Sequence, residues 1–166
     1  MKFNVWWGYH NIHIKEGGEW KATFKTNQGL FEPLVMFFGL CNSPATFQAF
    51  MNTAFADLIA SGHVVIYMDD ILIFTTTMEH HRQLTRQVLE RLLQYDLFLK
   101  PEKCTFAETS IEYLGLVISA NRIAMDPTKL KGIAAWPTPR TLKQVQVLLG
   151  FMNFYRRFIQ NFSHMA

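Results

Sequence analysis

Two adjacent carboxylates, Asp69 and Asp70, lie inside the apolar run of residues 64–74 (VVIYMDDILIF). An unpaired carboxylate is costly to bury, and two neighbouring ones also repel each other, so the pair must be exposed or neutralised. One interpretation is a solvated turn, because Asp is a common turn residue. The other is a hairpin that presents both carboxylates to divalent cations, which prefer oxygen ligands. The pair alone leaves both interpretations open.

The composition indicates one globular domain with a sizeable core. The 166 residues are 49% hydrophobic and 14% aromatic, which excludes a disordered chain. No apolar run approaches the roughly 20 residues that a membrane span needs, and the first ten residues lack the apolar core of a secretion signal. We therefore expect a soluble intracellular protein with no membrane partner. Cys41 and Cys104 form no CxxC or His-rich metal pattern, which favours two reduced thiols.

The charges are distributed unevenly along the chain. Residues 1–126 carry 10 Lys and Arg against 13 Asp and Glu, a net charge of −3 (10 − 13). Residues 127–166 carry the other six Lys and Arg (16 − 10) and no acid. Such a basic segment suggests a polyanionic partner, although a solvated helix face explains six charges nearly as well.

Strand-like segments are predicted along most of the chain. Residues 3–14 are expected to form a strand that turns at Gly8 and continues extended. The TNQG turn inside residues 20–38 predicts a β-hairpin. Residues 64–74 read as a second hairpin, and residues 97–118 return to a β-like pattern.

Helices are predicted between these strands. Ser43 is the expected N-cap of the first, with Pro44 in its first turn and Gly62 just past its end. The TTME sequence predicts a capping box in which Thr76 caps the next helix and Glu79 reaches back. These helices carry their apolar residues at 3-and-4 spacing, which is typical of an amphipathic helix packed on a sheet.

The C-terminal part is predicted to be helical. A turn is expected near residues 120–121, Asp126 should start one helix and Thr141 should cap another. Together with the β-α-β-β-α-β order of residues 3–118, this predicts an α+β fold with an antiparallel sheet covered by helices on one face. The change to basic helical sequence predicts an internal boundary near residues 120–126.

Six blocks of sequence resemble one family. In chain order they read FNVWWGYHNIHIKEG, GLFEPLVMFFGLCNSPATFQ, YMDDILIFT, LKPEKC, EYLGLVIS and WPTPRTLKQVQVLLGFMNFYRRFI. Their order and spacing are similar to those of reverse transcriptases (RNA-directed DNA polymerases) from gypsy-type long-terminal-repeat retrotransposons, over residues 2–166. The resemblance implies a polymerase palm at residues 1–120, with part of the fingers at about 15–38, and the helical start of a thumb at 121–166.

The resemblance also implies a reaction and its partners. A primer 3′-hydroxyl would attack the α-phosphate of a dNTP, assisted by two Mg²⁺ ions or by Mn²⁺ in their place, and Asp69 and Asp70 match two of the family's three metal-binding aspartates. The implied partners are an RNA or DNA template–primer duplex, the dNTP and the rest of a polyprotein. Upstream fingers, ribonuclease H and integrase regions are expected in that polyprotein. The implied location is a cytoplasmic virus-like particle, with the nucleus as a further site.

Nucleotide-site residues carry over from the family one at a time. Tyr9 matches the aromatic residue that selects deoxynucleotides; without the resemblance it would be taken for an ordinary core aromatic. Phe38 and Gly39 match the loop that supports the nucleotide, where glycine permits close backbone approach. Lys103 resembles a lysine proposed to protonate the departing pyrophosphate, although Lys100 competes for that assignment.

Primer and template contacts are expected from two further segments. One is a primer-grip hairpin, for which a plain strand pair is the alternative. The other is the basic thumb helix, whose cations would contact duplex phosphates without reading the base sequence. The residues concerned are Tyr113, Leu114 and Gly115 in the hairpin and Lys143, Arg156 and Arg157 in the thumb.

The match departs from the family at Asn4. The family's third metal ligand is an aspartate five residues before the position of Tyr9, which is Asn4 here, and the lost charge should weaken metal binding and slow the reaction. Trp6 also stands where the family usually has a basic or polar residue. Two functions therefore remain open. The first is a polymerase palm fragment of weak or no activity, and the alternative is a non-catalytic nucleic-acid-binding or scaffold remnant of a retrotransposon polyprotein.

Overall fold

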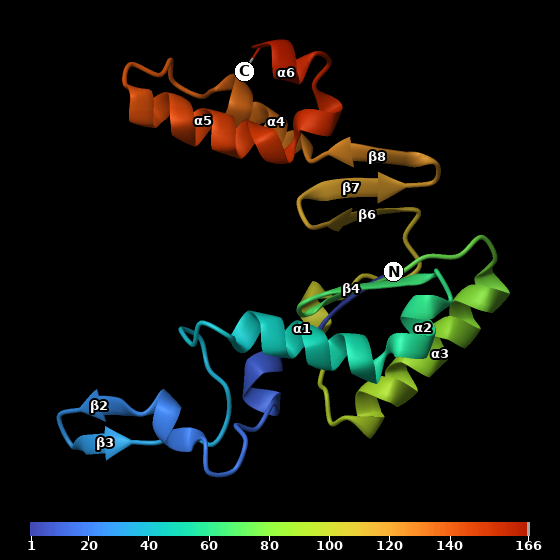
Figure 1. Ribbon diagram of the computed structural model, residues 1–166. Helices are drawn as coiled ribbons and strands as arrows, with labels where there is room; N and C mark the ends of the chain where they lie inside the picture. Colours follow the sequence, from blue (N-terminus) through green and yellow to red (C-terminus); the bar gives the residue numbers. More distant parts are fainter. Residues whose placement is uncertain (166) are drawn as a thin grey trace. The chain divides into compact units, whose positions relative to one another are not determined.

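The chain forms two compact units in the computed structural model, which describes residues 1–165. The first unit runs from Met1 to Ala107 and the second begins at Glu108. All strand pairs among the described residues are antiparallel, and helices alternate with them along the chain (Figure 1). The predicted α+β class is confirmed. Across residues 1–165, none of the helices combines the length and the apolar character that crossing a membrane requires.

The first unit is built on a three-stranded sheet. Its strands β1 (Lys2–Asn4), β4 (Val64–Tyr67) and β5 (Asp70–Ile73) are ordered β1-β5-β4. Alternation along β4 buries Val64 and Ile66 and exposes the residues between and after them, as expected for a strand with one covered face. The central strand β5 is buried along its apolar length. The first residue of β5, Asp70, is therefore the point where the core ends.

Three helices cover one face of this sheet (Figure 1). They are α1 (Ser43–Ala54), α2 (Ala56–Ala60) and α3 (Met78–Gln94). The long helix predicted through α1 and α2 is interrupted at Phe55, whose φ of −115° and ψ of 19° leave the helical range. Phe55 is fully buried, so the interruption accompanies the placement of a large ring in the core.

Two predicted caps are each off by one residue. The residue before α1 is Asn42, and the hydroxyl of Ser43 instead donates a hydrogen bond to the Phe37 carbonyl at 3.2 Å. The cap of α3 is Thr77, whose hydroxyl accepts from the His80 N–H at 3.4 Å, and not Thr76. In a run of adjacent threonines, spacing alone does not decide which hydroxyl meets the helix.

The extended segment predicted after Gly8 is a 3₁₀ turn, η1 (Gly8–Asn11). The chain bends before it because Trp7 has a left-handed backbone with φ 52°, and the Trp7 carbonyl accepts from the His10 N–H at 2.9 Å. The predicted TNQG hairpin is confirmed as β2 (Phe24–Thr26) and β3 (Gly29–Phe31), preceded by a short turn, η2 (Glu19–Ala22).

An arginine fastens α3 to the α1–α2 junction. Arg91 forms two parallel bonds of 2.8 Å to the Asp57 carboxylate, and it also donates to the carbonyl of Ala54. The side-chain hydrogen bond is the main cause that lowers the pKa of Asp57 and raises that of Arg91. A planar guanidinium is required to reach both acceptors at once.

We expect Arg91→Lys to lower the thermal unfolding midpoint modestly, because an ammonium keeps the charge but loses the two-pronged geometry. Thermal melts by circular dichroism would measure the shift. Glu90→Gln is the matched control, since Glu90 is the exposed neighbour on the same helix. Equal midpoints for Arg91→Lys and the unaltered chain would contradict this role.

The second unit contains one antiparallel sheet followed by helices. Strand β7 lies between β6 and β8, and the predicted caps are confirmed, because Asp126 accepts from the Thr128 N–H and Thr141 forms a capping box with Gln144. The elements are β6 (Ser110–Tyr113), β7 (Leu116–Ser119), β8 (Arg122–Met125), α4 (Pro127–Ala134), α5 (Leu142–Phe154), η4 (Arg156–Phe158) and α6 (Phe162–Met165).

The compact units divide the chain at residues 107–108, whereas composition places a boundary near residues 120–126. Because β7 pairs with β6 on one side and with β8 on the other, residues before and after position 120 belong to one sheet. The change from acidic to basic sequence thus falls at a turn inside the second unit. The assignment of residues 1–120 to a palm and 121–166 to a thumb stays a prediction.

Candidate functional site

The carboxylate pair lies at the tip of the β4–β5 hairpin. Tyr67 pairs with Asp70, so the loop consists of Met68 and Asp69 alone. Met68 has a left-handed φ of 54°, a backbone conformation that a residue other than glycine adopts at a cost of about 1–2 kcal/mol. Backbone strain of this kind is concentrated at functional positions. Asp69 and Asp70 are both half-buried, so the tip is neither a free solvated turn nor part of the core.

A glutamine of α1 holds this hairpin tip. The Gln48 carbonyl oxygen accepts from the Met68 N–H at 2.6 Å, and its amide nitrogen donates to the Ile66 carbonyl at 3.2 Å. Sequence reasoning gave Gln48 no part in placing the carboxylates. The available signal is a polar residue directly after buried Phe47 on the helix face that packs on the sheet.

Strand β1 brings Asn4 to the two carboxylates. Its register places Asn4 opposite Asp70, and the next residue, Val5, donates its N–H to the Asp69 carbonyl at 2.7 Å. The Asn4 amide nitrogen then donates to Asp69 Oδ2 at 2.8 Å and to Asp70 Oδ1 at 3.0 Å. This orientation is the one the hydrogen bonds select, because the amide oxygen would face two acceptors. The structure therefore brings Asn4, the position of the family's third metal-binding aspartate, against Asp69 and Asp70, the two residues that the resemblance assigns to metal binding.

The arrangement does not fit a pair of divalent cations. Among residues 1–165, no three His, Cys, Asp or Glu side chains are placed to hold a metal ion. Asn4 is 6% exposed, and it presents N–H groups to the carboxylates where a cation would need oxygen ligands. Its amide donates one hydrogen bond to each carboxylate. At the position where the resemblance implies Mg²⁺, the Asn4 amide therefore already bridges the two carboxylates.

A cavity of about 250 Å³ opens beside this cluster. Asn4 and Asp69 line it, and so do three residues predicted for nucleotide binding or catalysis, Tyr9, Phe38 and Lys103. Gly39 is not among its lining residues, although its φ of 106° is one that favours glycine. Lys100, the other candidate for the role predicted for Lys103, lines the cavity too. Its backbone N–H donates to the Asn4 carbonyl at 2.9 Å.

Tyr9 lies against other rings on the wall of the cavity. Its ring centroid is 5.0 Å from that of Phe38 and 5.7 Å from that of Phe47. Burial raises the pKa of its hydroxyl, and the negative charge of Asp69 raises it further. The hydroxyl is therefore neutral and able to donate a hydrogen bond near neutral pH.

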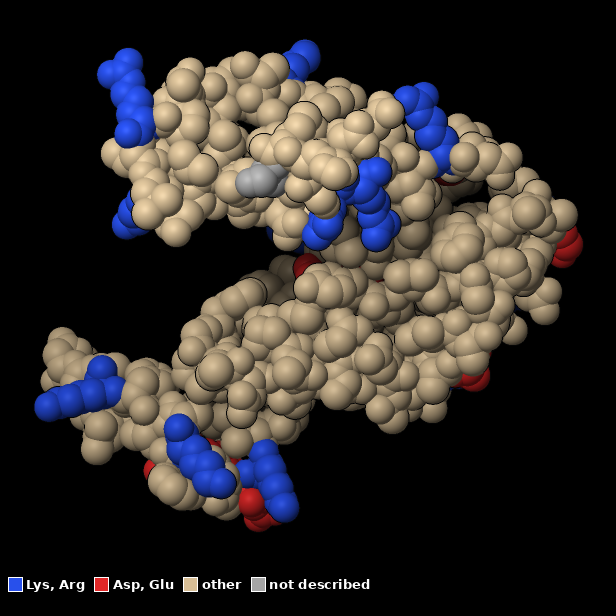
Figure 2. Space-filling model, turned by 45° about the horizontal axis from the view of Figure 1, so that its top comes forward, with Lys and Arg blue, Asp and Glu red and all other residues tan. Residues whose placement is uncertain are grey.

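The remaining predicted residues belong to the second unit. Leu114 and Gly115 form the two-residue loop between β6 and β7, with φ values of 51° and 74°, which is the pattern of a type I′ hairpin. Tyr113 is buried. This unit carries seven Lys and Arg and three Asp and Glu, and all seven cations are exposed, Lys143, Arg156 and Arg157 among them. Figure 2 shows most Lys and Arg side chains at separated points on the face it presents.

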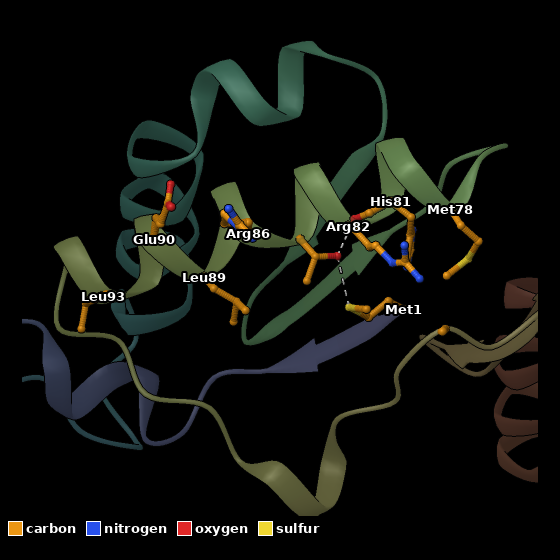
Figure 3. A pocket seen from close by; sticks show the side chains of 10 residues that line it. Met1, Met78, His81, Arg82, Arg86, Leu89, Glu90 and Leu93 are labelled. Carbon is orange, nitrogen blue, oxygen red and sulfur yellow. Dashed lines mark hydrogen bonds between the residues drawn. The ribbon is translucent and has the colours of Figure 1, made fainter.

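A larger cavity of about 530 Å³ lies along α3, on the side where Met1 lies (Figure 3), and neither Asp69 nor Asp70 lines it. Leu89 and Leu93 point from the helix toward the side where Met1 lies. His81 also lines it; its Nδ1 is 3.0 Å from the Thr75 hydroxyl, and its buried Nε2 has no hydrogen-bond partner within residues 1–165. Burial lowers the pKa of His81, and the positive N-terminus and His80 lower it further.

This lowered pKa makes stability depend on pH. The unfolded chain binds a proton near the ordinary histidine pKa of about 6.5, whereas native His81 binds it only at a lower pH, so stability is retained above the ordinary pKa and lost as the pH falls below it. Urea denaturation at pH 7.5 and 5.5 should show a larger loss for the unaltered chain than for His81→Leu. His10→Gln, which changes an exposed histidine, should leave the loss unchanged. Equal losses for all three chains would refute this assignment.

The comparison with protein families gives a match over most of the chain. Residues 1–118 match the family model described as "Reverse transcriptase (RNA-dependent DNA polymerase)". The chain is 36% identical over 159 residues to the retrovirus-related Pol polyprotein from transposon 297 of Drosophila melanogaster, covering 96% of this chain and 15% of that protein. It is 34% identical over 158 residues to the transposon Tf2-3 polyprotein of Schizosaccharomyces pombe, covering 95% and 12%. The chain thus spans less than a sixth of these relatives.

Solved structures of foamy viral protease–reverse transcriptase have the same fold. One, in complex with double-stranded DNA, has a TM-score of 0.89 and 25% sequence identity, over 98% of this chain and 28% of that one. Another, in complex with an RNA/DNA hybrid, has a TM-score of 0.81 and 24% identity, over 93% and 21%. The resemblance to retrotransposon reverse transcriptases found in the sequence is confirmed, although these matches do not distinguish the gypsy type. The chain belongs to the reverse transcriptase (RNA-dependent DNA polymerase) family.

Proposed function

We propose that this chain is the part of a reverse transcriptase that holds a template–primer duplex and a dNTP, and that Asn4 slows its templated DNA synthesis. In this reaction a primer 3′-hydroxyl attacks the dNTP and pyrophosphate leaves. The observation that carries the proposal is the bridging of Asp69 and Asp70 by the Asn4 amide, beside a cavity that also contains Tyr9. The family's reaction depends on clustered carboxylates, and here an uncharged donor occupies their centre.

Other residues of the cavity take roles that need no charge at position 4. The neutral Tyr9 hydroxyl and ring provide a wall for the sugar of the nucleotide. Lys103 is exposed beside the cavity and can contact the phosphates. The seven exposed cations of the second unit support duplex binding through phosphates, and the bound DNA and RNA/DNA hybrid of the foamy viral structures point to the same ligands. The rest of a polyprotein, with fingers, ribonuclease H and integrase regions, completes the proposed set of partners.

Primer extension tests the catalytic part of this proposal. On poly(rA)/oligo(dT) with dTTP and Mg²⁺, we expect Asn4→Asp to extend about a thousandfold faster than the unaltered chain, since several kcal/mol of barrier correspond to that factor. Asn27→Asp makes the same change at an exposed turn and should give no gain. Duplex binding, measured by fluorescence anisotropy, should be equal in all three. Absence of duplex binding, or extension by the unaltered chain at the rate of Asn4→Asp, would refute the proposal.

The bridged carboxylates also favour a second candidate, a non-catalytic nucleic-acid-binding or scaffold protein. The uncharged Asn4 amide donates a hydrogen bond to Asp69 and another to Asp70. Because these bonds hold the two carboxylates without a cation, the fold around them does not depend on one. This candidate predicts salt-dependent duplex binding that persists in EDTA and is unchanged by Asp69→Ala. A metal-dependent gain in extension by Asn4→Asp would decide for the polymerase instead.

A further inference from the structure

Two tryptophans beside the cavity remain exposed. Trp6 is 46% and Trp7 is 65% exposed, and their ring centroids lie 5.1 Å apart. Both line the cavity that contains Asn4. Large aromatic side chains normally gain free energy from burial, so two adjacent exposed indoles are an informative exception. Their exposure indicates a ligand that covers the faces of the two indole rings.

The tryptophans are the end of a continuous series of ring contacts around the cavity. Successive centroids in this series are 5.1, 5.8, 6.3, 5.0 and 5.7 Å apart. The rings belong, in spatial order, to Trp6, Trp7, His10, Phe38, Tyr9 and Phe47. Only the last is fully buried, so most of the series presents aromatic surface outward.

Hydrogen bonds hold the backbone that carries the two indoles. Trp7 has the left-handed φ of 52°, and its carbonyl accepts from the His10 N–H at 2.9 Å. The backbone N–H of Trp6 donates to the Phe98 carbonyl at 2.7 Å. The backbone carbonyl of Trp6 accepts from the Asn11 side chain at 3.2 Å. A residue with a Cβ in this conformation is strained, and such strain tends to persist where it serves a function. The backbone that carries the two rings is therefore held in place without a ligand.

The charges beside the rings indicate what the ligand carries. Lys100 and Lys103 line the same cavity. Lys100 is 3.5 Å from Glu102, whereas Lys103 is exposed and has no ion pair among the described residues. Flat aromatic surface next to a lysine suits a planar, apolar ring joined to an anion. A nucleobase joined to its phosphate has this chemistry.

We propose that Trp6 and Trp7 form a stacking surface for an unpaired base of a single-stranded nucleic acid, with Lys103 contacting its phosphate. An unpaired base offers a free ring face, whereas the bases of a duplex are covered by their neighbours. A cavity of about 250 Å³ is below the roughly 300–1,000 Å³ of sites for drug-sized ligands, which limits it to a unit about the size of one nucleotide. This inference rests on the proposed function, because it names a ligand of the same cavity, one that would occupy it in the absence of a dNTP.

Two octanucleotides separate stacking from charge. Oligo(dA) and an abasic oligomer of the same length carry the same phosphates, but the second has no bases. We expect tryptophan fluorescence titrations to give about five- to hundredfold tighter binding of oligo(dA), the range expected for stacking of one base. Trp7→Gly and Trp6→Ala should remove most of this difference. Free dAMP, titrated in parallel, should bind more weakly than the strand, since it adds no neighbouring phosphates.

Matched variants keep this test decisive. Trp7→Gly suits the left-handed backbone, so it removes the indole without loss of the fold, which a thermal melt verifies. Trp20→Ala removes a tryptophan of the same unit that is 62% exposed and does not line the cavity, and it should leave the difference intact. Equal binding of the two oligomers, or an equal loss in Trp20→Ala, would overturn the inference. Lost duplex binding with a retained preference for oligo(dA) would instead refute the proposed function alone.

Discussion

Asn4→Asp is expected to lower the free energy of unfolding by about 3 kcal/mol in EDTA, although it restores the residue that the family carries. The change replaces two N–H donors by a third carboxylate at a position that is 6% exposed. Three carboxylates then face one another, so the repulsion between their like charges disfavours the native state. Urea denaturation followed by circular dichroism would give the difference directly.

Divalent cations should reverse this loss. Mg²⁺ or Mn²⁺ offsets the repulsion among the three carboxylates, so the unfolding midpoint of Asn4→Asp should rise with cation concentration while that of the unaltered chain stays nearly constant. Asn27→Asp again serves as the control, because its added charge lies at an exposed turn. A midpoint of the unaltered chain that rises with Mg²⁺ as steeply as that of Asn4→Asp would show that the amide does not exclude the cation.

Gly8→Ala is expected to destabilise the first unit by about 1–3 kcal/mol through overpacking. A Cβ on Gly8 would lie 2.5 Å from Cζ of Phe47, well inside contact distance, and Phe47 is 1% exposed. The ring cannot move aside without disturbing the core under the cavity. The tyrosine ring that packs on Phe47 should shift with it, so ligand binding should weaken as well.

A double-mutant cycle tests whether this contact is the cause. Phe47→Leu shortens the side chain that the new methyl group meets, so Gly8→Ala should cost less in the Phe47→Leu background than alone. Gly132→Ala, in helix α4, is the control, because a Cβ there has no neighbour within 4 Å. It should leave the free energy of unfolding unchanged or raise it by up to about 1 kcal/mol. Additive effects of Gly8→Ala and Phe47→Leu would exclude the proposed clash.

The sequence was sufficient for the features that local chemistry decides. The apolar run around Asp69 and Asp70 predicted a hairpin, and the caps Asp126 and Thr141 were located correctly because each is followed by a distinct helical pattern. The count back from Tyr9 selected Asn4, which the structure places against both carboxylates. Patterns that combine short-range spacing with one strong signal were thus reliable.

Features decided by tertiary contacts could not be predicted in this way. The interruption at Phe55 and the left-handed Trp7 depend on packing and hydrogen bonds that no periodicity reveals. The direction of the Asn4 amide follows from the antiparallel register of β1 and β5, which the sequence does not contain. Gln48 supports the hairpin from a helix 20 residues before Met68, so its contribution is visible only in the folded chain. The roles assigned in catalysis and in primer binding stay predictions.

The bridge between Asn4 and the carboxylates has a consequence for the order of folding. Asp70 and Asn4 are 66 residues apart in the chain, whereas the β4–β5 hairpin closes over two residues. Short loops close far sooner than long ones, so we expect the hairpin to form early and β1 to dock late. Strand β1 contributes only three paired residues to β5, and local opening is easiest for such short elements. Whenever β1 detaches, Asp69 and Asp70 would then be uncovered. This local fluctuation would leave the β4–β5 hairpin that carries them intact.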